Sequence, residues 1–120
     1  MPHASITDIE NLPPLLAREA RLLGLDVGTK TIGMALSDVT RSVATPYDTI
    51  RRGKFTADAK TIREVVEENQ VGALVIGLPL NLDGSEGPRA QSTRAFARNL
   101  AAHVEVPMVF WDERLSTAAV

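Results

Sequence analysis

Three acidic residues lie within or directly after apolar segments, where burial of a carboxylate is costly. Asp26 is the single carboxylate between Leu22 and Leu36, and Asp112 and Glu113 follow the apolar segment 107–111. A carboxylate buried in an apolar strand loses hydration that it regains only from hydrogen bonds, a cation or a metal ion. We therefore expect Asp26 to be a buried residue with a role in metal or phosphate chemistry.

The positions of these acids at the ends of predicted strands indicate a metal site at one edge of a sheet. Asp26 ends one predicted strand, Asp112 and Glu113 follow another, and ligands gather at the carboxyl ends of parallel strands. Converging carboxylates repel each other unless a divalent cation neutralises them, and oxygen ligands suit Mg²⁺ or Mn²⁺. Such ions support phosphodiester hydrolysis. We expect Asp26 and Glu113 to be metal ligands, and both, with Asp112, to be catalytic.

A structural role is the alternative for each of these acids. Asp26 could cap a turn, and Asp112 and Glu113 could begin a helix, where negative charge is favourable. For Asp26 the functional interpretation is the better supported one. For the other two acids both interpretations stay open.

The apolar pattern predicts an α/β fold that would position these acids. The predicted order is strand 21–27, strand 31–37, strand 42–51, a helix from 55 to near 72, strand 73–77, a helix from 88 and strand 107–111. An antiparallel meander followed by right-handed parallel crossovers gives a mixed five-stranded sheet with helices on its faces. Pro46 marks an edge strand or a bulge, and strand 73–77 is continuously apolar, as expected of a strand covered on both faces.

Composition and charge exclude several classes of protein. The 120 residues, 44% hydrophobic and 23% charged, fit one compact domain. The absence of cysteine removes disulfides, zinc–thiolate sites and thiol catalysis. Segment 71–80 is too short to span a bilayer, and residues 1–12 lack the pattern of a signal peptide, so we expect a cytoplasmic protein without a membrane partner.

The net charge of −2 argues against a strongly basic nucleic-acid binder but not against a nuclease. Acids at a metal site lower the total charge, while local basic residues still meet phosphates. Lys30, in the predicted hairpin turn, and Arg114, after the acid pair, are candidate substrate contacts, and Arg52 is a further one.

The loop 78–87 could admit a nucleic-acid backbone closely, with Asn81 and Ser85 as candidate substrate-binding residues. Glycine in such a loop more commonly serves only a turn. The arginines of the helix that follows, Arg89 included, are expected to form a solvated face. Trp111 could stack on a base, but core packing is the expected role.

Three blocks of residues occur in order along the chain. They are residues 24–33 (Gly-Leu-Asp-Val-Gly-Thr-Lys-Thr-Ile-Gly), 75–84 (Val-Ile-Gly-Leu-Pro-Leu-Asn-Leu-Asp-Gly) and 112–117 (Asp-Glu-Arg-Leu-Ser-Thr). Together they resemble the YqgF family of Holliday junction resolvases, in the RNase H-like superfamily. The resemblance implies a metal-dependent nuclease acting on branched DNA or on the precursor of small-subunit ribosomal RNA, with Asp26 and the Asp112–Glu113 pair at its site.

The resemblance also carries expectations about domains and assembly. It covers residues 21–117, which leaves residues 1–20 as an N-terminal arm before a nuclease domain, 21–120. The family continues past the third block into a further helix with another acidic residue, and this sequence ends at Val120. A site without that acid holds a second metal ion weakly, so this 120-residue form is expected to fold but to cleave weakly. Action on a symmetric junction predicts a homodimer.

Two other classes of protein share parts of this pattern. The Asp-x-Gly-Thr sequence at 26–29 is similar to the first phosphate-binding turn of actin-like ATPases and sugar kinases. Those proteins enclose a nucleotide between two such domains, and this chain has room for one. A non-catalytic module that binds nucleic acid or protein, with its acids in structural roles, is the remaining alternative.

Overall fold

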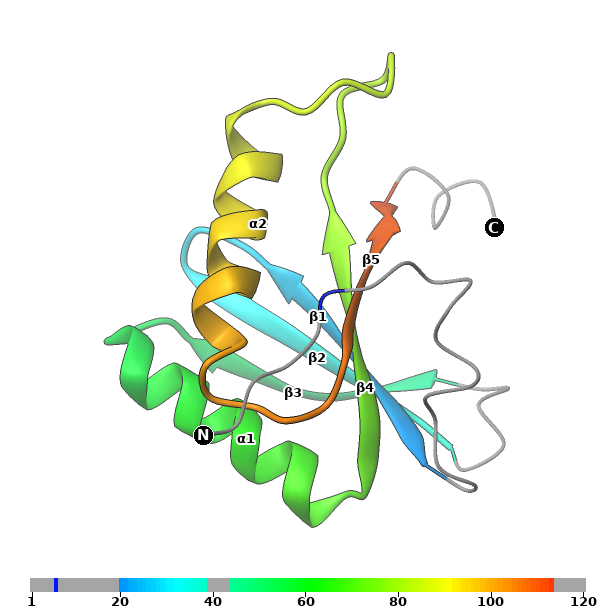
Figure 1. Ribbon diagram of the computed structural model, residues 1–120, viewed down its shortest axis with the longest axis vertical. Coiled ribbons are helices and arrows are strands. Elements are labelled where there is room, and N and C mark those ends of the chain that lie inside the picture. Colours follow the sequence, from blue (N-terminus) through cyan, green and yellow to red (C-terminus); the bar gives the residue numbers. More distant parts are fainter. Residues whose placement is uncertain (1–5, 7–19, 39–43, 114–120) are drawn as a thin grey trace.

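The computed structural model describes residue 6, residues 20–38 and residues 44–113 (Figure 1). The elements are β1 (Arg21–Val27), β2 (Thr31–Ser37), β3 (Ala44–Arg51), α1 (Phe55–Glu68), β4 (Val71–Leu78), α2 (Pro88–Leu100) and β5 (Met108–Asp112). This order confirms the one predicted from the apolar pattern. The predicted N-terminal arm, apart from residues 6 and 20, and Arg114 lie outside the described residues.

The five strands form one mixed sheet in the order β3-β2-β1-β4-β5. β2 runs antiparallel to both β1 and β3, whereas β4 runs parallel to β1 and β5. The predicted meander followed by parallel crossovers is thereby confirmed. The carboxyl ends of β1, β4 and β5 lie at one edge of this sheet.

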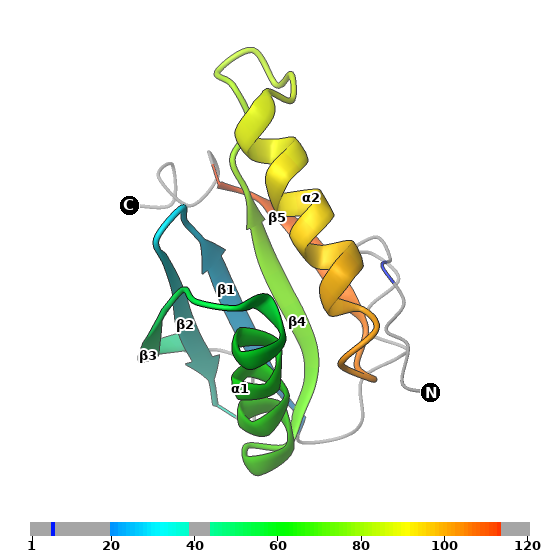
Figure 2. The same ribbon diagram turned by 90° about the vertical axis from the view of Figure 1, so that its left-hand side faces the viewer.

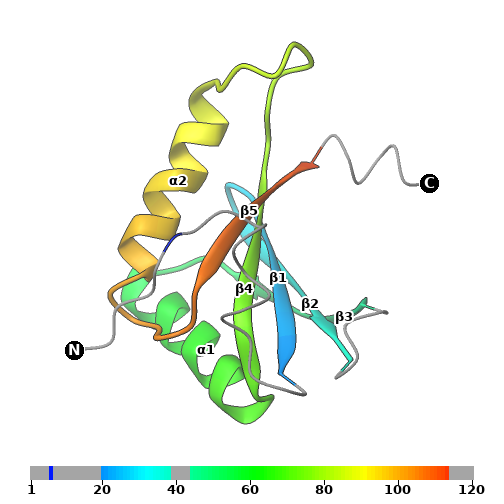
Figure 3. The same ribbon diagram turned by 45° about the vertical axis from the view of Figure 1, so that its right-hand side comes forward.

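Both described helices pack on the same face of the sheet (Figures 2 and 3). Crossover connections between parallel strands are right-handed. From β3 through α1 to β4, and from β4 through α2 to β5, the chain steps across the sheet in the same direction between parallel strands, so the two crossovers place α1 and α2 on one side. The opposite face of the sheet carries neither of them.

The main core lies between these helices and the sheet. Leu23 of β1, Ile32 of β2, Ile62 of α1 and Leu100 of α2 are all fully buried. Phe55 and Phe96, one from each helix, meet edge to face with ring centroids 5.5 Å apart. Burial of this apolar surface is the main force that holds the helices on the sheet.

The edge strand β3 confirms both of the expectations attached to Pro46. β3 pairs only with β2, so it ends the sheet on one side. Its register skips one residue, since Asp48 pairs with Met34 and Pro46 pairs with Ala35. Proline has no N–H to donate to a neighbouring strand, which explains why it is found at an edge and beside a bulge.

Two expectations about burial are wrong. β4 is covered on both faces only in its first half, where Ala73 is fully buried; Val75 and Gly77 on the same face are half-buried. The spacing of the apolar residues in α1 predicts that Asp58 lies on the polar side of the helix, but Asp58 is 6% exposed and its carboxylate accepts the backbone N–H of Gly53 at 3.2 Å. That bond satisfies a donor next to the start of α1, which offsets the loss of hydration.

No helix in the described part of the chain is long and apolar enough to cross a membrane.

Candidate active site

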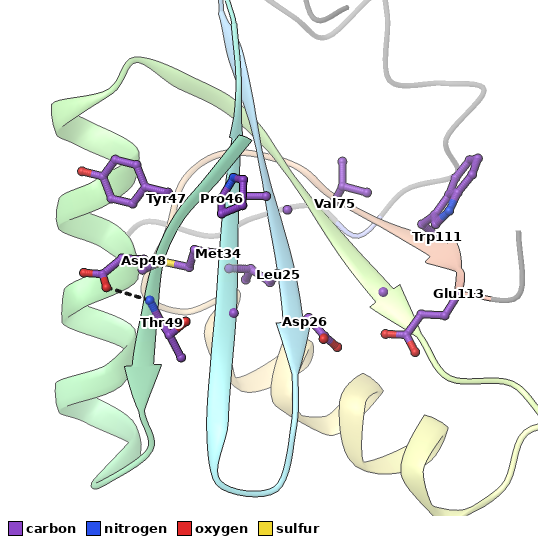
Figure 4. Close-up of a pocket in the computed structure, with 14 residues that line it drawn as sticks. Leu25, Asp26, Met34, Pro46, Tyr47, Asp48, Thr49, Val75, Trp111 and Glu113 are labelled. Atoms are coloured by element: carbon purple, nitrogen blue, oxygen red, sulfur yellow. Dashed lines mark hydrogen bonds between the residues drawn. The ribbon is translucent and has the colours of Figure 1, made fainter. Parts of the chain in front are cut away.

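Asp26 and Glu113 converge from the two strands that flank β4. Asp26 stands one residue before the end of β1, and Glu113 follows β5 directly. Both side chains lie on the face opposite the helices and point toward each other across β4 (Figure 4). Two of the three acids that the sequence predicts to be catalytic are therefore brought together.

Asp26 is exposed, so its predicted burial is wrong. Side chains alternate between the two faces of a strand, and Leu25 and Val27 point into the main core while Asp26 points to the open face. The adjacent hairpin turn is closed by its own backbone, because the Gly28 N–H donates to the Thr31 carbonyl at 2.8 Å. The case for a functional Asp26 thus depends on its convergence with Glu113.

Gly77 makes room for this convergence. It lies on β4 between the two acids, paired with Trp111 of β5. A Cβ atom at this position would lie 2.5 Å from Glu113 Oε1 and 3.0 Å from its Cγ. Since real Cβ atoms essentially never approach that closely, any side chain at residue 77 would displace the Glu113 carboxylate.

The surroundings of Glu113 raise the pKa of its carboxyl group. Partial burial is the largest cause, followed by the negative charge of Asp26 and a hydrogen bond with Asp26. The positive charge of Arg89 opposes them by lowering the pKa. A bound cation would relieve the repulsion between these two negative groups, because like charges disfavour double ionisation.

Asp112 is not part of this convergence. It pairs with Leu78, is half-buried, and does not line the pocket that holds Asp26 and Glu113. Alternation along β5 explains the difference, because it directs neighbouring side chains to opposite faces. Among residues 6, 20–38 and 44–113, no group of three or more His, Cys, Asp or Glu side chains comes together in a way that could hold a metal ion. The catalytic role of the three acids stays a prediction.

The acid pair lies in a pocket of about 760 Å³ on the open face of the sheet. Val75 contributes to its apolar floor, and Tyr47 and Trp111 lie at its two ends (Figure 4). Trp111 is 37% exposed, so it forms a wall of the pocket instead of the core packing that the sequence suggested.

Three predicted substrate-binding residues of the described part of the chain lie outside this pocket, namely Lys30, Asn81 and Ser85. Lys30 is exposed in the hairpin turn between β1 and β2. Asn81 Nδ2 donates to Ser85 Oγ at 3.0 Å, and Ser85 Oγ donates to Asp83 Oδ1 at 2.6 Å. Asn81 and Ser85 therefore bond to each other within the loop between β4 and α2, and their substrate role stays a prediction.

Two arginines have roles that the sequence did not indicate. Arg52 Nη1 donates to the Gly28 carbonyl at 2.6 Å, which holds the hairpin turn in place. Arg89, expected on a solvated helix face, lies in the first turn of α2 and acts electrostatically on Glu113. A basic residue one position after the helix-opening Pro88 was the only signal in the sequence.

The strand order, together with acids at the carboxyl ends of β1 and β5, defines an RNase H-like fold. The solved structure of T. thermophilus RuvC in complex with Holliday junction substrate matches 83% of this chain and 69% of its own, with a TM-score of 0.61 and 12% identity. A likeness at this identity concerns the fold alone.

The chain belongs to the RuvX family, also called YqgF, because the model of that family, described as Holliday junction resolvase, matches residues 20–120. A relative from Methylocella silvestris named "Putative pre-16S rRNA nuclease" is 58% identical over 117 residues, which cover 98% of this chain and 73% of the relative. A relative of the same name from Paramagnetospirillum magneticum is 62% identical over 105 residues, or 88% and 68% of the two chains.

Proposed function

We propose that this protein is a divalent-metal-dependent nuclease that hydrolyses phosphodiester bonds in structured nucleic acid. The observation that carries the proposal is the convergence of Asp26 and Glu113 over Gly77. Membership of the RuvX family and the names of close relatives support the same activity.

The donor atoms of this site fit a hard cation. Both converging groups are carboxylates, and Mg²⁺ and Mn²⁺ prefer oxygen ligands. Burial and the negative charge of Asp26 raise the pKa of Glu113, so a bound cation would replace the proton on the Glu113 carboxyl group. When bound, such an ion activates water and stabilises the leaving oxygen of a phosphodiester. In this proposal Asp26 and Glu113 hold the ion and Arg89 contacts a phosphate of the substrate.

The choice of substrate within this proposal lies between two structured nucleic acids. The names of the relatives favour the precursor of 16S ribosomal RNA, and the family description favours a Holliday junction. Both substrates are compatible with a cytoplasmic protein, and the symmetry of a junction would require a homodimer.

The decisive experiment measures Mn²⁺-dependent cleavage of a labelled four-way DNA junction and of precursor 16S RNA. Asp26→Asn and Glu113→Gln should each lower cleavage about 100-fold or more, because each removes a charge that binds the ion. Asp112→Asn should lower it by less than about tenfold, because Asp112 lies outside the pocket.

Asp48→Asn is the matched control, since this exposed acid on β3 lines the far end of the same pocket. Calorimetric titration with Mn²⁺ gives a second readout that does not depend on activity. Cleavage that persists in Asp26→Asn would contradict the assignment of the site. Absence of both cleavage and Mn²⁺ binding would favour the non-catalytic module.

A further inference from the structure

The loop between β4 and α2 presents an apolar side chain to solvent. This loop, residues 79–87, projects beyond the rest of the molecule (Figure 1), and Leu82 within it is 94% exposed. A single exposed leucine is common on protein surfaces. Leu82 differs from other exposed leucines in two ways. Hydrogen bonds hold its loop in one shape, and the loop begins next to the acid pair.

Hydrogen bonds within the loop fix the shape of its tip. The Gly84 N–H donates to the Asn81 carbonyl at 2.8 Å, and the Asn81 N–H donates to the Ser85 carbonyl at 2.9 Å. Gly84 has a φ of 90°, a conformation that favours glycine. The Asp83 carboxylate accepts both the N–H and the hydroxyl of Ser85, at 2.9 and 2.6 Å. The tip is therefore an ordered turn.

The base of the loop is fastened to the fold. Glu86 accepts two hydrogen bonds from Arg94 of α2, from Nε and Nη2, each at 2.7 Å. The Arg94 guanidinium also lies over the Phe110 ring of β5, 4.8 Å from its centroid. A bidentate pair of this kind restricts orientation as well as distance. The negative charge of Glu86 is therefore compensated by Arg94, and that of Asp83 is partly compensated by its two hydrogen bonds from Ser85.

The loop begins at the acid pair. β4 carries Gly77 between Asp26 and Glu113, and Leu82 follows only five residues later. Five residues span at most about 18 Å when extended. One strand of a nucleic acid advances about 3.4 Å per base step, so Leu82 lies within roughly five base steps of the acid pair.

We propose that Leu82 is an apolar wedge that inserts between neighbouring bases of the nucleic acid held at the acid pair. Leucine on a rigid support is one of the side chains that unstack base steps in this way. The inference rests on the proposed nuclease function and adds to it a residue that selects unpaired or branched positions, where bases separate at the least cost.

The test uses substrates that carry the fluorescent base 2-aminopurine, whose emission rises when it is unstacked. Asp26→Asn is the parent for every variant, so that bound substrate stays uncut, and binding is measured separately by anisotropy. A four-way DNA junction and an RNA hairpin carry the label at the branch or loop. We expect Leu82→Ser to remove most of the rise in emission and to weaken binding about threefold to tenfold. Leu82→Phe should restore both.

Ile6→Ser is the matched control. Ile6 is an exposed aliphatic residue beside Met108, at the end of β5 away from Glu113, and its substitution should change neither signal. If Leu82→Ser leaves emission and affinity at the parent values, Leu82 is not a wedge. This conclusion holds even if the unmutated chain cleaves the substrate. If the parent binds neither substrate and the unmutated chain cleaves neither, the proposed function fails together with the wedge.

Discussion

A substitution at Gly77 should disturb the candidate site without destabilising the fold. We predict that Gly77→Ala lowers Mn²⁺-dependent cleavage about 100-fold, because small displacements of a reacting group carry penalties of that size. The new Cβ would meet the end of the flexible Glu113 side chain rather than backbone, so the melting temperature should hardly change. Cleavage assays and thermal melts measure the two effects.

Gly53→Ala is the control for this substitution, because a Cβ at residue 53 meets nothing within 4 Å. It should leave cleavage and melting unchanged. A Gly77→Ala protein that cleaves at the normal rate would show that the Glu113 carboxylate is not needed where the structure places it.

The raised pKa of Glu113 predicts a pH dependence of stability in the metal-free protein. An acid whose pKa is higher in the folded state favours folding fully at low pH, and this contribution is lost as the pH rises through the folded pKa. The groups that act on Glu113 are Asp26, which raises its pKa, and Arg89, which lowers it.

Glu113→Gln keeps this side chain neutral at every pH, so it removes that loss. The melting temperature of the variant relative to the unmutated protein should therefore rise from about pH 4 to pH 7. Mn²⁺ should reverse the trend, because it binds the ionised pair. A difference in melting temperature that is constant with pH would contradict the prediction.

At the scale of elements, the hairpin of β1 and β2 depends on a contact made by Arg52, the residue directly after β3. Arg52 donates to the carbonyl of Gly28 at 2.6 Å, and its guanidinium lies 5.5 Å from the centroid of the Phe96 ring. Arg52→Ala should lower the free energy of unfolding by roughly 1–2 kcal/mol, as measured by urea denaturation. Arg51→Ala, at the exposed neighbouring position, should cost less than about 0.5 kcal/mol. Equal losses in the two variants would exclude a specific role for Arg52.

The elements themselves could be predicted from local signals. Pro46 indicated both the edge strand and the bulge, because a missing N–H has the same consequence in any sheet. Pro88 marked the first residue of α2, where proline is tolerated. The buried Asp58 was missed, because its hydrogen bond to the Gly53 N–H depends on how the chain enters α1. Periodicity carries no information about that bond.

For the whole molecule, the charge distribution predicts a weak dependence of nucleic-acid binding on salt. The net charge is −2, and Arg52 and Arg94 are engaged in contacts within the fold. With Lys30, Arg89 and Arg114 as the candidate phosphate contacts, the logarithm of affinity should fall against the logarithm of salt concentration with a slope of about −3.

Anisotropy titrations with Asp26→Asn at several salt concentrations measure this slope. Adding Lys30→Ala should reduce its size by about one, whereas adding Lys60→Ala, on the exposed side of α1, should not change it. A slope of about −6 or steeper would indicate a larger basic surface than the described residues provide.

The sequence by itself determined the order of the strands and helices, the hairpin and the family, and it predicted three acids, Asp26, Asp112 and Glu113, at one edge of the sheet. Turn residues, periodicity and ordered motifs are local properties, so they can be identified along the chain. Only the tertiary structure decided that Asp26 is exposed, that Asp112 lies outside the pocket, and that Gly77 separates the converging acids. These facts follow from strand register and from the face to which each side chain alternates, and both depend on pairing between segments that are distant in sequence.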